Sequence, residues 1–103
     1  MKLLTKKISD DAKAQYDKGS SLEDQMIVGK FFTPWSNWTW YLMNMHEDEN
    51  YCWGIVQGNA LEMGSFLIQE LKAVDGPFGL KIERDKYFKP INAHDMWEKL
   101  NNE

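Results

Sequence analysis

The segment FFTPWSNWTWY, residues 31–41, is the feature that most constrains how this chain can fold. It places six large aromatic rings and one proline within eleven residues. Aromatic side chains bury more apolar area than any others, so a segment this dense either anchors a small core or presents a binding surface to a partner. The two uses are compatible, and the sequence pattern by itself leaves both open.

The chain has 103 residues, which predicts a single domain over residues 1–103. One core can form at this length without disulfides or a metal. The only cysteine, Cys52, has no intramolecular disulfide partner, and MKLLTKKISDD lacks the apolar run of a signal peptide. No apolar stretch approaches the roughly 20 residues that cross a bilayer. We therefore expect an intracellular protein without membrane contact.

The charge balance argues against one class of partner. The formal net charge is -4 and the sequence pI is about 5.1. Direct binding to a nucleic-acid backbone normally requires clustered lysine and arginine, so we expect none. An acidic protein can instead bind a basic partner. A mild acidic excess also keeps small proteins soluble, so the charge does not by itself indicate DNA mimicry.

Hydrophobic spacing predicts an α+β fold. Residues 5–18 favour a helix that Thr5 or Ser9 caps and Gly19 ends. Its narrow apolar stripe is expected to pack on a sheet. Strands are expected near residues 26–32, 37–45, 51–57 and 61–67, with turns at TPWS, HEDEN and QGNA. The pattern indicates an antiparallel meander of four or five strands, with the N-terminal helix on one face and short helices near the C-terminus.

The second of these strands has two apolar faces. Simple alternation places Trp38, Trp40 and Leu42 on one face, and the other face then carries Thr39, Tyr41, Met43 and Met45. A strand of this kind is usually central, because each apolar face needs a covering layer. We expect a helix on one side of the sheet and a second layer or a partner on the other.

Two short helices are predicted after the fourth strand. QELKAVDG favours a helix that ends at Gly76, and GPFGL is a turn whose path Pro77 and two glycines fix. Residues 82–88 either extend or form a loop. Asn92 can cap a final amphipathic helix with a buried stripe of Met96, Trp97 and Leu100.

No motif for catalysis or metal binding stands out. His46 and Cys52 flank an acidic run, but they lack the paired ligand spacing of a zinc site. No nucleophile signature surrounds Cys52, Ser36 or Ser65, and GPFGLK lacks the glycine density of a phosphate-binding loop. We therefore predict no enzyme activity, no metal and no cofactor.

Glu83, Arg84 and Asp85 form a cluster of opposite charges just after the stiff GPFGL turn. Such a group can organise a binding or catalytic site. It is more often a structural hub, because the planar guanidinium of arginine pairs readily with carboxylates. Both interpretations are kept here.

Several segments, taken in order, resemble a family of small proteins of unknown function that is common on bacterial plasmids and conjugative elements. These segments are FFTPWSNWTWY, WGIVQG, LEMGSF, QELKAV and GPFGLKIERDKYF. The resemblance covers roughly residues 2–90 and leaves HDMWEKLNNE outside it. In motif content and size the chain is also similar to type II-A anti-CRISPR proteins.

This resemblance implies a protein that inhibits the RNA-guided DNA nuclease of type II CRISPR systems by stoichiometric binding, in the cytoplasm of a bacterial host cell. The partner would be the nuclease or its guide-loaded complex. The nucleic-acid channel of such a nuclease is strongly basic, so it can attract an acidic domain. Protein binding is favoured over DNA mimicry. A monomer is expected, and a weak dimer remains open.

Side-chain chemistry, rather than the resemblance, selects the candidate partner-binding residues. Trp35 lies in the turn of the aromatic block and can serve as an anchor, unless it folds back onto the sheet. The charged candidates are Glu47, Asp48, Glu49, Glu83, Arg84 and Asp85.

Two other functions remain open on the sequence alone. The first is an accessory or anti-restriction protein of a plasmid or conjugative element without CRISPR activity, which predicts a large apolar surface patch. The second is a small enzyme that uses Glu83, Arg84 and Asp85. It predicts a concave pocket at these residues and a carboxylate with a perturbed pKa.

Overall fold

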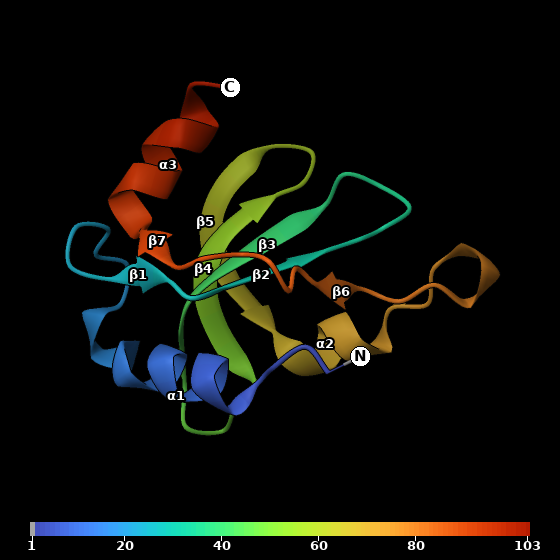
Figure 1. Cartoon of the computed structure of the whole chain (residues 1–103), viewed down its shortest axis with the longest axis horizontal. Coiled ribbons are helices and arrows are strands. Elements are labelled where there is room, and N and C mark those ends of the chain that lie inside the picture. The colour runs from blue at the N-terminus through green and yellow to red at the C-terminus, as the bar shows by residue number, and fades with distance from the viewer. Residues whose placement is uncertain (1) are drawn as a thin grey trace.

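The computed structural model describes residues 2–103 and has the predicted α+β architecture, a five-stranded antiparallel sheet with helices packed against it (Figure 1). The helices are α1 (Lys6–Ala14), η1 (Tyr16–Lys18), α2 (Ile68–Ala73), η2 (Pro77–Gly79) and α3 (Ala93–Asn101), of which η1 and η2 are single 3₁₀ turns. The strands are β1 (Met26–Ile27), β2 (Gly29–Phe32), β3 (Thr39–Met45), β4 (Tyr51–Gln57), β5 (Leu61–Leu67), β6 (Glu83–Arg84) and β7 (Ile91–Asn92).

Helix α1 is capped at Thr5, one of the two caps that the sequence left open. The side-chain oxygen of Thr5 accepts a hydrogen bond of 3.1 Å from the backbone N–H of Ile8. The helix is shorter than the predicted range of residues 5–18, because α1 ends at Ala14 and the chain continues as η1. Gly19 then adopts a φ of 55°, a conformation that glycine takes without steric strain, and the chain turns there as predicted.

The main sheet has the strand order β5-β4-β3-β2-β6, and every neighbouring pair is antiparallel. The predicted strands at 51–57 and 61–67 match β4 and β5. The first predicted strand, 26–32, is divided at Val28: β2 stays in the main sheet, while β1 pairs with β7 in a separate two-stranded sheet. The fifth strand is β6, which comes from the segment whose conformation the sequence left open.

A β-bulge in β3 overturns the predicted faces of that strand. Leu42 is opposite Gly54 and Asn44 is opposite Trp53, so Met43 is an extra residue with no partner in β4. An extra residue reverses the alternation beyond it. Met45 therefore lies in the same core as Leu42, on the opposite side of the sheet from Met43. The expectation that Met43 and Met45 share a face is wrong for this reason.

Two hydrophobic cores lie on opposite faces of the sheet. Core 1 lies under α1 and α2, and its buried residues include Leu3, Ala12, Val28, Phe31, Leu42, Met45, Cys52, Ile68, Leu71 and Ile82. Core 2 lies under α3, and its buried residues are Ile27, Tyr41, Met43, Ile55, Ala93, Met96 and Leu100. The second covering layer that the two-faced strand requires is thus supplied by the chain itself.

The C-terminal helices form as predicted, with changed bounds. Helix α2 ends at Ala73, because Val74 is already extended, three residues before the predicted stop at Gly76. The side chain of Asn92 caps α3 by accepting a hydrogen bond of 3.2 Å from the backbone N–H of Asp95. The predicted stripe of α3 faces core 2, with Trp97 at its partly buried margin. Within residues 2–103, none of the helices has the length and hydrophobicity that a bilayer crossing needs.

Candidate functional site

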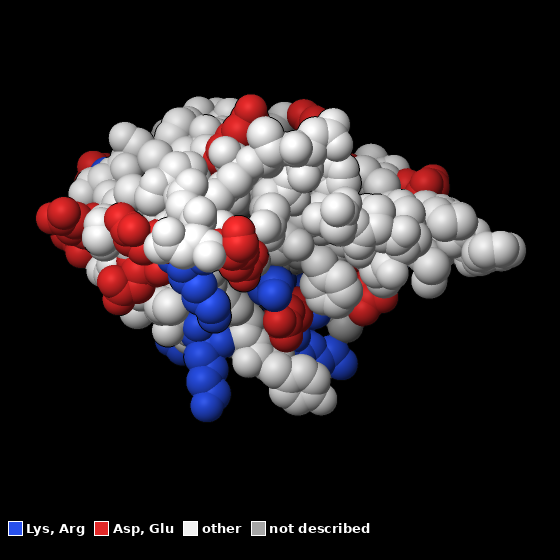
Figure 2. Space-filling view, turned by 90° about the horizontal axis from the view of Figure 1, so that it is seen from above, with Lys and Arg blue, Asp and Glu red and all other residues white. Residues whose placement is uncertain are grey.

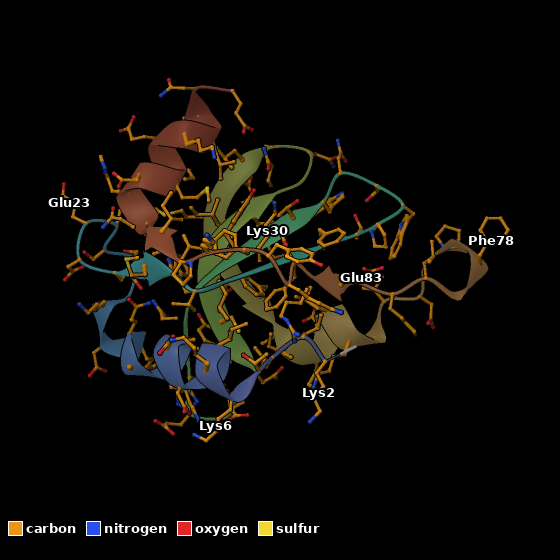
Figure 3. All side chains as sticks on the ribbon, in the orientation of Figure 1. Lys2, Lys6, Glu23, Lys30, Phe78 and Glu83 are labelled. Carbon is orange, nitrogen blue, oxygen red and sulfur yellow. The ribbon has the colours of Figure 1, made fainter. Side chains whose placement is uncertain are left out.

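A groove of about 570 Å³ lies at the β6 edge of the sheet. It is formed where β2 pairs with β6, an arrangement that sets Phe32 opposite Glu83 and Phe31 opposite Arg84. The groove therefore joins the aromatic block to the charged segment IERDKYF. The sequence showed both motifs as features but did not predict that they meet. Figure 3 shows Lys30 and Glu83 on the two neighbouring strands of this edge.

The charged residues of the groove hold the chain in place. The backbone N–H of Asp85 donates a 2.9 Å hydrogen bond to the carbonyl oxygen of Lys30, and the Lys30 Nζ lies 3.8 Å from the Asp85 carboxylate. The same carboxylate accepts a 2.9 Å hydrogen bond from the backbone N–H of Tyr87. The guanidinium of Arg84 donates to the carbonyl oxygen of Lys2. These contacts fix β6 and the residues after it against β2, and the pairing of Arg84 with neighbouring carboxylates stays a prediction.

Aromatic side chains line the groove together with these charged residues. Tyr87 is 90% exposed, and Trp38, which also lines the groove, is 37% exposed. Trp38 stacks on Trp40 with ring centroids 5.9 Å apart and planes inclined by 30°. The Trp38 ring also lies against Gly58, where a Cβ atom would overlap it. Trp38 is thus a fixed wall of the groove, while the Tyr87 ring is free to contact a partner.

An arm extends from the sheet beside the groove and ends in an exposed phenylalanine. The arm comprises residues 75–81 and is closed at its base by a 2.8 Å hydrogen bond from the N–H of Gly76 to the carbonyl of Leu80. Phe78 sits at the tip and is fully exposed. Figures 1 and 3 show the arm reaching away from the body of the molecule with Phe78 at its far end. The sequence predicts a turn in this segment, but it does not single out Phe78 as a candidate contact residue.

The backbone of Phe78 is left-handed, with φ 57° and ψ 27°. A residue with a Cβ atom is strained by roughly 1–2 kcal/mol in this region, and such strain is concentrated at functional sites. The contacts that close the base of the arm, which include an ion pair between Lys81 and Asp75, support this backbone conformation. The arm therefore presents one large apolar ring on a locally stabilised support.

Trp35 supports the base of this arm. Its ring lies over Gly76, so close that a Cβ atom on Gly76 would be 2.6 Å from it, and it packs against core 1. The side chain is partly buried. Trp35 thus folds back onto the protein, the alternative to a free anchor that the sequence left open. A direct role of Trp35 in partner binding stays a prediction.

The acidic turn 47–49 lies at the other end of β3 from the groove (Figure 1). The Asp48 carboxylate accepts hydrogen bonds from the backbone N–H groups of Asn50 and Tyr51, at 2.9 and 3.1 Å. These bonds hold the pKa of Asp48 below its ordinary value. The Lys13 ammonium, 2.8 Å from the carboxylate of Glu49, lowers the pKa of Glu49.

The turn therefore closes onto α1, and its three carboxylates are not part of the groove. Glu47 is exposed. The seven candidate residues thus divide into three locations: the groove for Glu83, Arg84 and Asp85, the base of the arm for Trp35, and the α1 side of the sheet for the acidic turn. No single surface patch at the groove contains them all.

Figure 2 shows how charge is distributed when the molecule is viewed from above. Acidic side chains are crowded at the left end and are also scattered over the rest of this face, whereas basic side chains gather along the lower side of the view. The tip of the projecting right-hand end, where the arm lies, carries neither kind. The arm tip is thus apolar, beside a surface of mixed charge.

Cys52 is fully buried in core 1, and its side chain has no access to the groove. Burial, with a smaller contribution from the Asp48 carboxylate, raises the pKa of the Cys52 thiol to about 12. A thiol of this kind is a poor nucleophile, because the thiolate is the reactive form. In the part of the chain that the structure describes, no three His, Cys, Asp or Glu side chains come together as a metal site.

We expect the native protein to react with Ellman's reagent at pH 8 at least about 100-fold more slowly than the same protein in 6 M guanidinium chloride. Unfolding removes the burial that raises the Cys52 pKa and also admits the reagent. Because the chain has one cysteine, the absorbance change reports this residue alone. Equal rates in the two conditions would contradict the buried placement of Cys52.

The chain matches a known protein family. The family model described as "Protein of unknown function (DUF2958)" matches residues 3–103. This range includes the C-terminal segment that the sequence resemblance left outside, so the boundary near residue 90 is corrected. No curated protein matches the chain, and no solved structure matches it.

Proposed function

Because the chain belongs to the DUF2958 family of proteins of unknown function, we propose a role for it from its surface: it binds and inhibits the RNA-guided DNA nuclease of a type II CRISPR system in a stoichiometric complex. The arm and the groove beside it form the contact face. The choice of nuclease as the partner rests on the resemblance of the aromatic block and GPFGLKIERDKYF to anti-CRISPR proteins.

The observation that carries the binding role is the exposure of Phe78. A fully exposed phenylalanine places a large apolar ring in water, where it contributes nothing to the core. Aromatic and arginine side chains dominate the energetics of protein interfaces when they enter a pocket on the partner. The left-handed backbone of Phe78, which costs stability while the ring stays exposed, also supports this role.

The groove supplies polar contacts next to this apolar anchor. Tyr87 offers a ring and a hydroxyl, and Lys86 is an exposed cation on the same segment. Tyrosine is favoured at interfaces because its ring buries area while its hydroxyl keeps a hydrogen bond. An apolar tip with a polar, charged flank matches the anatomy of a protein-binding face, which has a hydrophobic centre and a polar rim.

The decisive experiment is a titration of the purified protein into a guide-loaded type II nuclease, with cleavage of target DNA and binding of target DNA followed in parallel. At nuclease concentrations well above the dissociation constant, cleavage should fall linearly and end near one molecule of inhibitor per nuclease. Loss of DNA binding over the same range would assign the block to DNA recognition. Retained DNA binding would assign it to the cleavage step.

Two results would reject the proposal. Inhibition that is complete far below equimolar amounts would require turnover, and the groove beside Glu83 and Asp85 would then favour the small-enzyme alternative. An unchanged cleavage rate for a panel of type II nucleases, with no complex detected by sizing chromatography, would favour the alternative of a plasmid accessory or anti-restriction protein. A heat-denatured sample of the same protein is the control for nonspecific effects.

A further inference from the structure

The two edges of the main sheet differ in how they are protected. The β6 edge is short and charged: β6 has two residues, and Lys86 and Pro90 follow it. Short strands, lysine and proline are the devices that prevent sheets from pairing edge to edge. The β5 edge has none of them. β5 is a regular strand of seven residues, LEMGSFL, with a single charged side chain, Glu62.

The backbone groups that β5 leaves unpaired can be assigned from its pairing with β4. At the two ends of this hairpin, the N–H of Ile68 donates to the carbonyl of Asn50, at 3.0 Å, and the N–H of Gly58 donates to the carbonyl of Ala60, at 3.1 Å. Hydrogen-bonded pairs alternate along an antiparallel ladder. The even-numbered residues of β5 therefore bond to β4, and the odd-numbered ones point their N–H and C=O groups outward: Leu61, Met63, Ser65 and Leu67.

We propose that the β5 edge binds a second copy of this chain, as an antiparallel β5–β5 pair with Gly64 on the twofold axis. This register sets Leu61 opposite Leu67 of the other copy and Met63 opposite its Ser65. All four outward-facing residues then lie in hydrogen-bonded positions. A shift of the register in either direction would leave fewer of them paired. The two sheets become one continuous sheet across the axis, and the interface is isologous.

The residue on the axis suits this position. In the proposed register Gly64 faces its own counterpart in a non-hydrogen-bonded pair, where Cα atoms approach to about 4.5 Å. Because glycine has no side chain, the two residues do not crowd each other on the face of the sheet. The space around Gly64 is open, because a Cβ atom built there meets no atom within 4 Å. The face of the sheet is therefore uncrowded at the centre of the strand.

The charges of the strand are compatible with self-pairing. Glu62 falls opposite Phe66 of the second copy, and the two Glu62 side chains are four positions apart along the strand, roughly 14 Å. Like charges directly opposite each other would oppose pairing, and this register avoids them. The apolar side chains Leu61, Met63 and Phe66 are only partly buried in the single chain, so pairing removes further apolar area from water.

The contact between two β5 strands is small. Stable interfaces bury about 1,200–2,000 Å² in total, and one pair of seven-residue strands provides less. We therefore expect a reversible dimer with a dissociation constant of about 10⁻⁵ to 10⁻³ M. Sedimentation velocity of the unaltered chain from about 10 μM to 1 mM should show the weight-average sedimentation coefficient rising with concentration. A single monomer boundary at 1 mM would overturn the proposal.

A cysteine on the axis tests the register. The proposed Cα separation at Gly64 lies within the range that a disulfide spans, so Gly64→Cys should form a covalent dimer under oxidised glutathione. The matched control is Glu62→Cys, an exposed position on the same strand and the same face. Its counterpart is too distant, so it should cross-link at least about tenfold more slowly. Native Cys52 is buried and present in both variants.

Equal cross-linking rates for the two cysteine variants would indicate random collision and overturn the register. A further variant, Ser65→Pro, removes an outward-facing N–H and should raise the dissociation constant about tenfold or more, because proline blocks an edge strand. Circular dichroism establishes whether this variant folds. If it does not fold, the cross-linking rates of Gly64→Cys and Glu62→Cys alone test the β5–β5 pairing. None of these measurements depends on the proposed inhibition of a nuclease.

Discussion

Replacing Gly54 by alanine should lower the free energy of unfolding by about 3 kcal/mol or more. A Cβ atom at this position would overlap the carbonyl oxygen of Tyr41 and lie 3.0 Å from its carbonyl carbon. Both atoms belong to the backbone of β3, immediately before the bulge at Met43. The methyl group can therefore be accommodated only by moving a central strand that both cores contact. Urea unfolding followed by tryptophan fluorescence measures the change.

Gly64→Ala is the matched control for this substitution. Gly64 is directly opposite Gly54 in the pairing of β4 with β5, and its Cβ would meet open space. The same chemical change should therefore alter the free energy of unfolding by no more than about 0.5 kcal/mol. If the two alanine variants were destabilised equally, the close approach of β4 to β3 at Gly54 would not be present in the folded protein.

Replacing Phe78 by alanine should weaken the proposed inhibition of the nuclease by about 30-fold or more, equivalent to at least 2 kcal/mol of binding free energy. The physical reason is that the ring is exposed in the free protein and is expected to be buried in the complex. Folding should be unaffected, because the ring contributes no buried area to either core. Inhibitory titrations and urea unfolding of the same preparation measure the two quantities.

Phe78→Gly separates binding from stability most sharply. Glycine tolerates the left-handed backbone at this position, so the free energy of unfolding should stay the same or rise by up to about 1 kcal/mol while inhibition is lost. Phe78→Tyr keeps the ring and should retain inhibition. Met26→Ala removes a partly exposed apolar side chain from β1, away from the arm, and serves as a control. Full inhibition by both Phe78→Ala and Phe78→Gly would remove the arm from the contact face.

The elements of the fold could be predicted because their signals are local. β-Branched and aromatic runs separated by turn-forming residues gave the strands at 39–45, 51–57 and 61–67 to within about two residues. The caps at Thr5 and Asn92 were visible because a side-chain oxygen three residues before a helical N–H is a short-range pattern. These features depend on neighbours in the chain and on little else.

The bulge could not be predicted, because it depends on a partner strand. Nothing in TWYLMNM distinguishes an extra residue at Met43 from regular alternation; the distinction arises only when β3 is aligned with β4. Asn44 offers a partial explanation after the fact. It is almost fully buried, and its side-chain amide donates to the carbonyl of Gly19, at 2.8 Å, and to the side chain of Gln25, at 3.0 Å. The bulge lies directly before Asn44, so it determines the position from which the Asn44 side chain makes these two hydrogen bonds.

The candidate site was only partly accessible to sequence reasoning. Charge clustering selected Glu83, Arg84 and Asp85, which do line a groove. Aromatic density selected Trp35, whose ring rests on Gly76. Phe78 lies in a segment rich in turn-forming residues and has no sequence signal of its own. Exposure is a property of the packed molecule. A single phenylalanine between proline and glycine carries no periodicity from which its exposure could be inferred.

The two cores are completed at different times during synthesis. The buried residues of core 1 all lie between Leu3 and Ile82, whereas core 2 joins Ile27 in the first third of the chain to Ala93, Met96 and Leu100 of α3. While the protein emerges from the ribosome, the sheet can close on α1 and α2 and leave its other face bare. The nascent chain thus exposes Ile27, Tyr41, Met43 and Ile55 until α3 has emerged and docks, and this interval is when it is most open to aggregation or to a chaperone.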